Sequence, residues 1–256
     1  MTASAWAPLL AELDRWHATG RRLRLWLRDD DAVAPSAALD RLSAAAARFD
    51  VPILLAVIPM LADAALADAL RGRLLLPCQH GCWHRNHAPA GAKKSEFGPD
   101  RAADAVDAEI AQAWRRLRDL LGETLLPIFV PPWNRIDPRH AARLPALGFA
   151  GLSCFRDHRN GPDGGPALLN THVDVMDWHG GRVGRSAAAL VGEIATLLAG
   201  WREDEPGADA LGLLLHHRDH DEAAWSVLDD LLTIVAAHPA AAFADPRSLL
   251  YPDGLA

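Results

Sequence analysis

The sequence predicts an α/β fold in which short parallel strands alternate with longer helices. Apolar runs and helical patterns follow one another along most of the 256 residues, as expected of β-α units. Most of the apolar runs lack polar alternation, which indicates a sheet covered on both faces or closed into a barrel. Polar clusters follow several of these runs, and the carboxyl ends of parallel strands meet at one edge.

The first half of the chain contains four predicted strands, at residues 23–27, 51–58, 74–78 and 125–130. The N-terminal 20 residues are expected to form an amphipathic helix, with Leu9, Leu10, Leu13 and Trp16 on one side. Further helices are expected at residues 36–49, 60–70 and 101–121, the last ending at Gly122 as a C-cap.

The second half continues the same order. Strands are expected at residues 149–154, 171–178 and 210–217, and helices at 137–147, 187–198 and 221–238. No linker or internal repeat divides the chain. We therefore expect one domain over residues 1–256, with its core at about 22–240.

Composition excludes several classes of protein. A net charge of −7 argues against a nucleic-acid partner. No stretch approaches ~18 uninterrupted apolar residues, so no membrane span is expected. The N-terminus lacks the pattern of an export signal, which predicts a cytoplasmic protein. Three cysteines do not make a disulfide framework in a chain of this size. Nothing in the sequence indicates an oligomeric state.

The stretch LPCQHGCWHRNH carries potential metal ligands at alternate positions: Cys78, His80, Cys82 and His84. The two histidines are spaced so that both can reach one ion. Two histidines and one carboxylate leave coordination positions open, as a hydrolytic metal site requires. Adding both cysteines would give a closed structural zinc site instead. Histidines without a metal are the third interpretation.

Three other clusters each have a functional and a plain structural interpretation. The run RDDD at residues 28–31 places adjacent carboxylates where a cation would relieve their repulsion, or it is a solvated loop. VPPWN at residues 130–134 is an aromatic wall for a ligand or a rigid turn. DVMDW at 174–178 and HHRDHD at 216–221 supply a histidine held by a carboxylate for acid catalysis, or a polar rim.

In this order, the clusters resemble the five motifs of the polysaccharide deacetylase superfamily, the NodB-homology domain of carbohydrate esterase family four. The resemblance spans about residues 23–232. The motif T-F-D-D-G corresponds to RDDDA, and H-x-x-x-H to residues 80–84. R-P-P corresponds to VPP, D-x-x-D-W to DVMDW, and L-x-H to residues 214–216. The resemblance implies a deformed (β/α) barrel, here from a divergent branch.

The resemblance also implies one divalent metal ion, commonly Zn²⁺, with Co²⁺, Ni²⁺ or Mn²⁺ as alternatives. Asp31, His80 and His84 would hold it, and Asp30 would be the general base. A register shifted by one residue, which would use Asp29 and Asp30 instead, stays open.

By the same resemblance, His216 is the general acid, oriented by Asp174 or Asp177. His217 is the alternative to His216. The pocket would be framed by residues of the third and fourth motifs and of the histidine stretch: Pro132, Trp133, Asn134, Trp178 and Trp83.

Two positions depart from the family pattern. Val130 stands where the family has an arginine that orients the catalytic aspartate, and Asn134 or Arg135 are candidates to replace it. Gly81 stands where the family often has Ser or Thr.

The function that the resemblance implies is metal-dependent hydrolysis of an amide. An acetyl or other acyl group would be removed from a saccharide or another small molecule. One alternative is a catalytically silent member that keeps the fold as a metal-binding or ligand-binding module. A glycosidase would instead need two carboxylates ~5–10 Å apart across a groove. A measurement of bound metal would distinguish these possibilities, because the hydrolase and the silent metal-binding module both predict a bound metal and the glycosidase does not.

Overall fold

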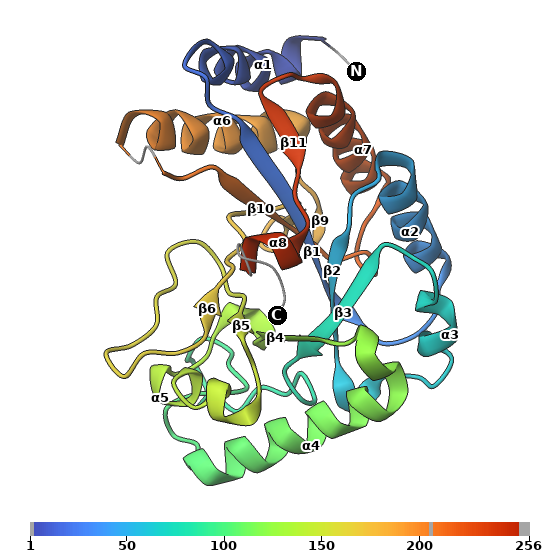
Figure 1. Cartoon of the computed structure of the whole chain (residues 1–256), viewed down its shortest axis with the longest axis vertical. Helices are drawn as coiled ribbons and strands as arrows, with labels where there is room; N and C mark the ends of the chain where they lie inside the picture. Colours follow the sequence, from blue (N-terminus) through green and yellow to red (C-terminus); the bar gives the residue numbers. More distant parts are fainter. Residues whose placement is uncertain (1–2, 205–206, 251–256) are drawn as a thin grey trace.

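The computed structural model describes residues 3–204 and 207–250, in which strands and helices alternate (Figure 1). One sheet contains β1 (Leu23–Ala32), β2 (Ile53–Val57), β3 (Leu75–His80), β4 (Leu126–Val130), β5 (Gly151–Leu152), β6 (Ala167–Leu168), β7 (Val173–Asp174), β10 (Ala210–Leu215) and β11 (Ala241–Phe243). A separate antiparallel ribbon is formed by β8 (Met176–Asp177) and β9 (Val183–Gly184).

The helices pack around this sheet. They are α1 (Ala3–Ala18), α2 (Ala37–Phe49), α3 (Leu66–Leu70), α4 (Ala103–Leu121), α5 (Pro138–Ala141), α6 (Ala187–Asp204), α7 (Glu222–Ala237) and α8 (Pro246–Leu250). Short 3₁₀ turns are η1 (Pro59–Leu61), η2 (Gly122–Thr124), η3 (Pro132–Asn134) and η4 (Leu144–Leu147). In Figure 1, α1 lies beside α6 and α2 beside α7. In the described part of the chain, no helix is long and apolar enough to cross a membrane.

The sheet has the order β6-β5-β4-β3-β2-β1-β10-β7, and every pair in it is parallel. Segment 167–175 joins its two ends. The amide of Leu169 donates to the carbonyl of Leu152 in β5, whereas the amide of Val175 donates to the carbonyl of Leu214 in β10. The sheet therefore curls into the barrel-like shape that the sequence predicts.

Side-chain alternation along the strands separates two apolar layers. Leu25 and Leu27 of β1 pack in the large core cluster under the helices. Trp26 packs on the other face, inside the curled sheet, in a cluster that also contains Leu54, Ala56, Cys78, Ile128 and Val130. Because successive strand residues point to opposite faces, Arg28 and Asp30 follow Trp26 on the inner face. The pleat of β1 thus directs two of its polar residues into the mouth of the barrel.

Most predicted elements are present, with four corrections. The first strand runs to Ala32, so the carboxylate run belongs to the strand and does not follow it. The predicted helix at residues 60–70 divides into η1 and α3, and that at 137–147 divides into α5 and η4. The predicted strand at 171–178 breaks into β7 and β8.

Candidate metal centre

Asp31 reaches the mouth of the barrel through an irregularity at the end of β1. Simple alternation would point it away from Asp30, toward the helices. Its φ of 72°, however, lies in the left-handed region, and the β1–β2 register shifts between Asp29 and Ala32. Such a bulge re-aims a side chain. Asp31 is consequently turned toward His80, the last residue of β3, and His84, which follows the strand.

His80 and His84 meet Asp31 at close range. The Nε2 atoms lie 3.2 Å (His80) and 3.3 Å (His84) from Asp31 Oδ1, an atom that is buried and accepts no hydrogen bond from the described residues. His80 Nδ1 lies 3.0 Å from the Val130 carbonyl, which only accepts, so Nδ1 carries the proton and Nε2 is free. Lone pairs that face one another at this distance require a proton or a metal ion between them.

The three residues fit a divalent metal. One ligand atom from each lies within 4.8 Å of the other two. Two imidazoles and one carboxylate suit zinc and related ions, and three protein ligands leave coordination positions open. The fit favours Asp31 as the third ligand over Asp30, which the shifted register would use.

The ionisation of the three side chains agrees with such a role. Burial by itself would raise the pKa of the Asp31 carboxyl, but the close approach of His80 and the charges of protonated His80 and His84 hold it well below its usual range. Burial and the charge of His80 lower the pKa of His84. The pKa of His80 is raised despite its burial, because Asp30 and Asp31 stabilise its protonated form. A metal ion would take the place of that proton.

Asp30 is held by Arg28, two residues earlier on the same face of β1. Arg28 Nε and Nη2 donate to the two carboxylate oxygens at 2.9 and 3.0 Å. The remaining guanidinium hydrogens go to Asn134 Oδ1, at 2.5 Å, and to Ser153 and the Cys154 carbonyl. Arg28 is fully buried.

The guanidinium that contacts Asp30 is therefore that of Arg28 in β1. The sequence suggested Asn134 or Arg135. The structure brings Asn134 to Arg28 as an acceptor only, whereas Arg135 is exposed and donates to the Lys94 carbonyl. The alternation Trp26-Arg28-Asp30 was the sequence signal that would have identified Arg28.

His216 lies opposite, at the end of β10. Its Nδ1 is 4.0 Å from Asp174 Oδ1, and its ring meets Trp178 edge to face at 4.6 Å between centroids. Trp178 Nε1 in turn donates to Asp174 Oδ2 at 2.8 Å. Burial raises the pKa of Asp174. Of the two carboxylates proposed to orient His216, the structure brings only Asp174 to it.

Asp177 serves the turn between β8 and β9 instead. Its Oδ1 accepts hydrogen bonds from the amides of His179 and Gly180. The expected catalytic role of Asp177 is not supported by these contacts, because turn formation occupies its carboxylate. The spacing of D-x-x-D-W could not distinguish the two aspartates.

Asp29 and His217 form a separate buried pair. His217 donates its amide to Asp29 Oδ2 at 2.8 Å, and its Nδ1 lies 2.5 Å from Asp29 Oδ1. Neither side chain is exposed. Burial would lower the pKa of His217, but Asp29 raises it overall. This pair connects β1 to the residues after β10. Because the two side chains bind each other, the contacts do not favour Asp29 as the base of the shifted register or His217 as the general acid in place of His216.

Glu96 is a buried residue near the site that sequence reasoning missed. Its carboxylate accepts hydrogen bonds from the amides of Cys82, Trp83 and Arg85, which flank His84. A Cβ on Gly81 would overlap this carboxylate and lie 2.6 Å from Pro132 Cδ. Gly81 has φ 54°. The glycine is thus required where the family often has Ser or Thr, because Glu96 and Pro132 fill the space.

The predicted pocket residues separate into three kinds. Trp133, with φ 56°, places its ring 4.5 Å from that of His84, and Trp178 contacts His216. Pro132 is buried against Gly81 and supports the turn. Trp83 is 40% exposed, and its recorded ring contact is with Arg85.

The cysteines lie outside the cluster. Cys78 packs inside the curled sheet, Cys82 packs in the cluster around Phe97, and burial raises the pKa of both thiols. Among the described residues, the group suited to a metal contains Asp31, His80 and His84 and no cysteine. The closed structural site is not formed.

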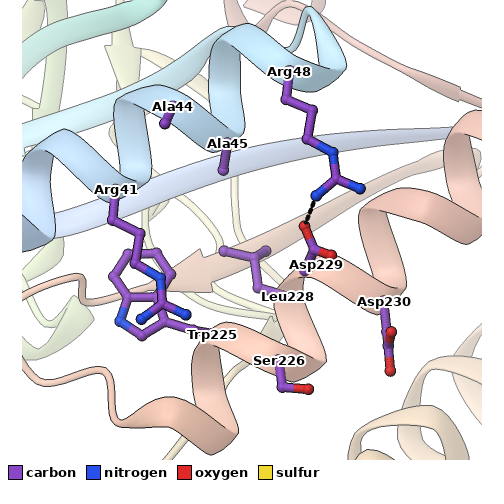
Figure 2. A pocket seen from close by; sticks show the side chains of 9 residues that line it. All are labelled: Arg41, Ala44, Ala45, Arg48, Trp225, Ser226, Leu228, Asp229 and Asp230. Atoms are coloured by element: carbon purple, nitrogen blue, oxygen red, sulfur yellow. Dashed lines mark hydrogen bonds and ion pairs between the residues drawn. The ribbon is translucent and has the colours of Figure 1, made fainter. Parts of the chain in front are cut away.

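A hollow of about 470 Å³ lies between α2 and α7 (Figure 2). Figure 2 shows Arg48 directed at Asp229, a 2.5 Å ion pair, and Arg41 lying over Trp225. Both arginines thus contact other residues that line the hollow. None of the predicted site residues lines it.

Comparison with known proteins gives structural but not sequence matches. No protein-family model and no curated protein matches the chain. A protein described as a polysaccharide deacetylase from Mycobacterium smegmatis superposes with a TM-score of 0.60 at 16% identity, over 84% of this chain and 76% of that one.

Two further solved structures are similar. A family 4 carbohydrate esterase from Streptomyces lividans, in complex with acetate, matches with a TM-score of 0.56 at 15% identity, over 88% of this chain and 95% of that one. A family 4 acetyl xylan esterase from Clostridium thermocellum, in complex with a cobalt ion, matches with a TM-score of 0.53 at 15% identity, over 89% and 90%. The protein therefore has the fold of the NodB-homology polysaccharide deacetylases, as the sequence motifs predicted.

Proposed function

We propose that the protein is a metal-dependent hydrolase that removes an acetyl or other acyl group from an amide nitrogen. The observation that carries the proposal is the Asp31, His80 and His84 cluster at the barrel mouth, with Asp30 one residue from the first of them. The similar structures, which include a deacetylase and two esterases, support the reaction class.

Each residue has a role that its contacts suit. A divalent ion held by Asp31, His80 and His84 would supply Lewis-acid activation of water and of the amide carbonyl. Asp30 accepts the proton of the attacking water, because Arg28 fixes its carboxylate and leaves each oxygen a further lone pair. His216, beside Asp174, donates a proton to the departing amine nitrogen. Trp133 and Trp178 flank these groups and exclude water from part of the site.

The substrate proposed at this level is an acylated saccharide or small molecule, and the products are an amine and a carboxylic acid. The alternative of a silent binding module drew its support from Val130. Arg28 weakens that support, because it supplies the guanidinium that position 130 lacks.

Metal stoichiometry tests the proposal first. Wild type is expected to bind about one Zn²⁺ or Co²⁺ per chain, and His80→Ala is expected to lose it. His87→Ala is the matched control, because His87 is an exposed histidine outside the cluster. Loaded wild type is then assayed for acetate release from N-acetylglucosamine oligomers and acetyl xylan. A wild type that takes up no metal after reloading would refute the mechanism.

A further inference from the structure

A groove of about 530 Å³ lies beside the candidate metal centre. It runs between the segments at residues 87–101 and 134–138. Asn134 lines it and also contacts Arg28, which holds Asp30. The neighbouring Trp133 stacks against His84. None of the three proposed metal ligands lines the groove, so Asn134 and the adjacent Trp133 are what connect it to the metal cluster.

Four cations surround the groove and the adjacent mouth of the site. We name Arg85, Lys93, Lys94 and Arg135 the basic rim. Lys93 and Arg135 line the groove, Lys94 Nζ lies 5.9 Å from the Trp133 ring centroid, and Arg85 lies over Trp83. All four are exposed. Lys93 and Lys94 are the only lysines of the chain.

The basic rim is not neutralised by the protein's own acids. Among the described residues, none of its members has a carboxylate oxygen within 4.0 Å, and Arg135 donates to a backbone carbonyl. Of the other charged residues lining the groove, Arg101 pairs with Glu109 and Asp137 with Arg139, which leaves Asp100. Elsewhere on this acidic protein some exposed arginines pair with carboxylates, as Arg24 does with Asp209 and Arg48 with Asp229, whereas others such as Arg115 and Arg159 have no such partner among the described residues.

From this charge arrangement we propose that the substrate is an acylated amine carrying an anionic oxygen group, a phosphate or a carboxylate, which the basic rim binds. The inference rests on the proposed function, because it takes the metal cluster as the place of the amide. The groove volume suits a group about the size of a monosaccharide. Unpaired cations around a cleft also attract an anionic ligand and accelerate its association.

Three probes with the same acetamide test the substrate class. N-acetylglucosamine is neutral, N-acetylglucosamine 6-phosphate carries a phosphate, and N-acetylmuramic acid carries a carboxylate. In metal-loaded wild type, we expect kcat/KM for at least one anionic probe to exceed that of the neutral probe by about tenfold or more. Its preference should fall with added salt, since screening weakens exposed charges. The better of the two anionic probes distinguishes phosphate from carboxylate.

Two double variants locate the effect. Lys93→Ala with Lys94→Ala should lower the anionic-to-neutral ratio by about tenfold. Arg71→Ala with Arg118→Ala removes the same charge from exposed ion pairs away from the groove, and it should keep the wild-type ratio. An equal use of all three probes, or the same ratio in both double variants, would overturn the proposed substrate class while leaving the hydrolase intact.

A measurement that needs no turnover separates the two proposals. Reductive methylation modifies only Lys93, Lys94 and the α-amino group, because the chain contains no other lysine. The anionic probes should slow methylation of both lysines by about tenfold or more relative to the neutral probe. Protection without hydrolysis of any probe would support the basic rim and refute the hydrolase. Hydrolysis without protection of the lysines and without preference for the anionic probes would support the hydrolase and refute the basic rim.

Discussion

Arg28 and Asp30 form a buried ion pair, in which each charge offsets the free-energy cost of burying the other. Arg28 is fully buried and Asp30 nearly so, and their bidentate contact is extended by acceptors on Asn134 and Ser153. Removing one member of such a pair leaves an uncompensated charge, whereas removing both does not. Asp30 thus depends on Arg28 both for its charge and for its orientation.

The first prediction concerns this pair. Arg28→Met should lower the free energy of unfolding by about 3–5 kcal/mol, because Asp30 loses its counter-charge. The double variant Arg28→Met with Asp30→Asn should recover part of that loss. Urea unfolding of the metal-free proteins measures both. Strictly additive losses would show that the two side chains are not energetically coupled.

The second prediction concerns Glu96. Glu96→Gln replaces one acceptor oxygen by an amide NH2 group, which is a donor facing the backbone N–H groups of the turn. The turn that carries His84 should therefore loosen. We expect metal affinity to fall by about 10- to 100-fold, the range seen when groups supporting metal ligands are removed. Titration of the metal-free protein with Co²⁺ measures the change.

Glu109→Gln is the control for Glu96, since Glu109 also interacts near this segment, through Arg101, but does not contact the His84 turn. A purely structural role of Glu96 would lower the melting temperature of the metal-free protein without weakening the metal. Unchanged Co²⁺ affinity in Glu96→Gln would therefore contradict the positioning role.

At the scale of elements, β7, β10 and α6 meet around His172. Its Nδ1 accepts the Gly212 amide at 3.0 Å, and its ring meets that of Trp201 at 5.0 Å. Burial lowers the pKa of His172 to about 4. The neutral ring is needed for the hydrogen bond, because a protonated Nδ1 cannot accept one.

The third prediction follows from the sign of this shift. The folded-state pKa lies below the unfolded value of about 6.5, so the stabilisation is present above pH 6.5 and is lost as pH falls toward 4. The loss attributable to His172 is about 3 kcal/mol, at 1.36 kcal/mol per pKa unit between about 6.5 and about 4. His172→Asn, which keeps an acceptor near the Gly212 amide, should flatten the acid dependence of urea unfolding between pH 6.5 and 4.5.

The exposed His17 provides the comparison for His172. His17→Gln should keep the wild-type acid dependence. An acid dependence that is the same in His172→Asn and wild type would mean that other groups, such as the similarly shifted His220, account for it.

At the scale of the whole molecule, the metal cluster lies outside the apolar clusters that hold the barrel together. Leucine, valine and isoleucine from the strands and from α1, α2, α6 and α7 form the large core cluster, and neither His80 nor His84 belongs to it. The barrel should therefore fold without metal, and metal should stabilise it only by binding.

The fourth prediction tests this separation. Metal-free His84→Ala should unfold within a few degrees of metal-free wild type. Added Zn²⁺ should raise the melting temperature of wild type only, by the equivalent of about 2.7 kcal/mol at 100 times the dissociation constant. Cys78→Ser should keep the Zn²⁺ response. A metal-free wild type that is unfolded would favour a structural role for the metal.

The element order and the motif positions could be predicted from local patterns. Gly122 follows α4 with φ 61°, as the sequence indicated, and α2 and α7 begin one residue after the predicted starts, where Ser36 and Asp221 act as N-caps. His80 and His84 were selected by spacing alone. The broken helices after β2 and β4 were not anticipated, because apolar residues at helical spacing do not reveal where a chain must turn to follow the sheet.

By itself the sequence determined the alternation of strands and helices, the five motifs, and the two histidines of the candidate centre. Only the tertiary structure decided which aspartate joins them, because the bulge at Asp31 reverses the direction that strand alternation would give. It also decided that Arg28 holds Asp30 and that Glu96 supports the His84 turn. Glu96 lies more than ten positions from the amides that it binds and belongs to none of the motifs, so only the tertiary packing shows that it supports the turn.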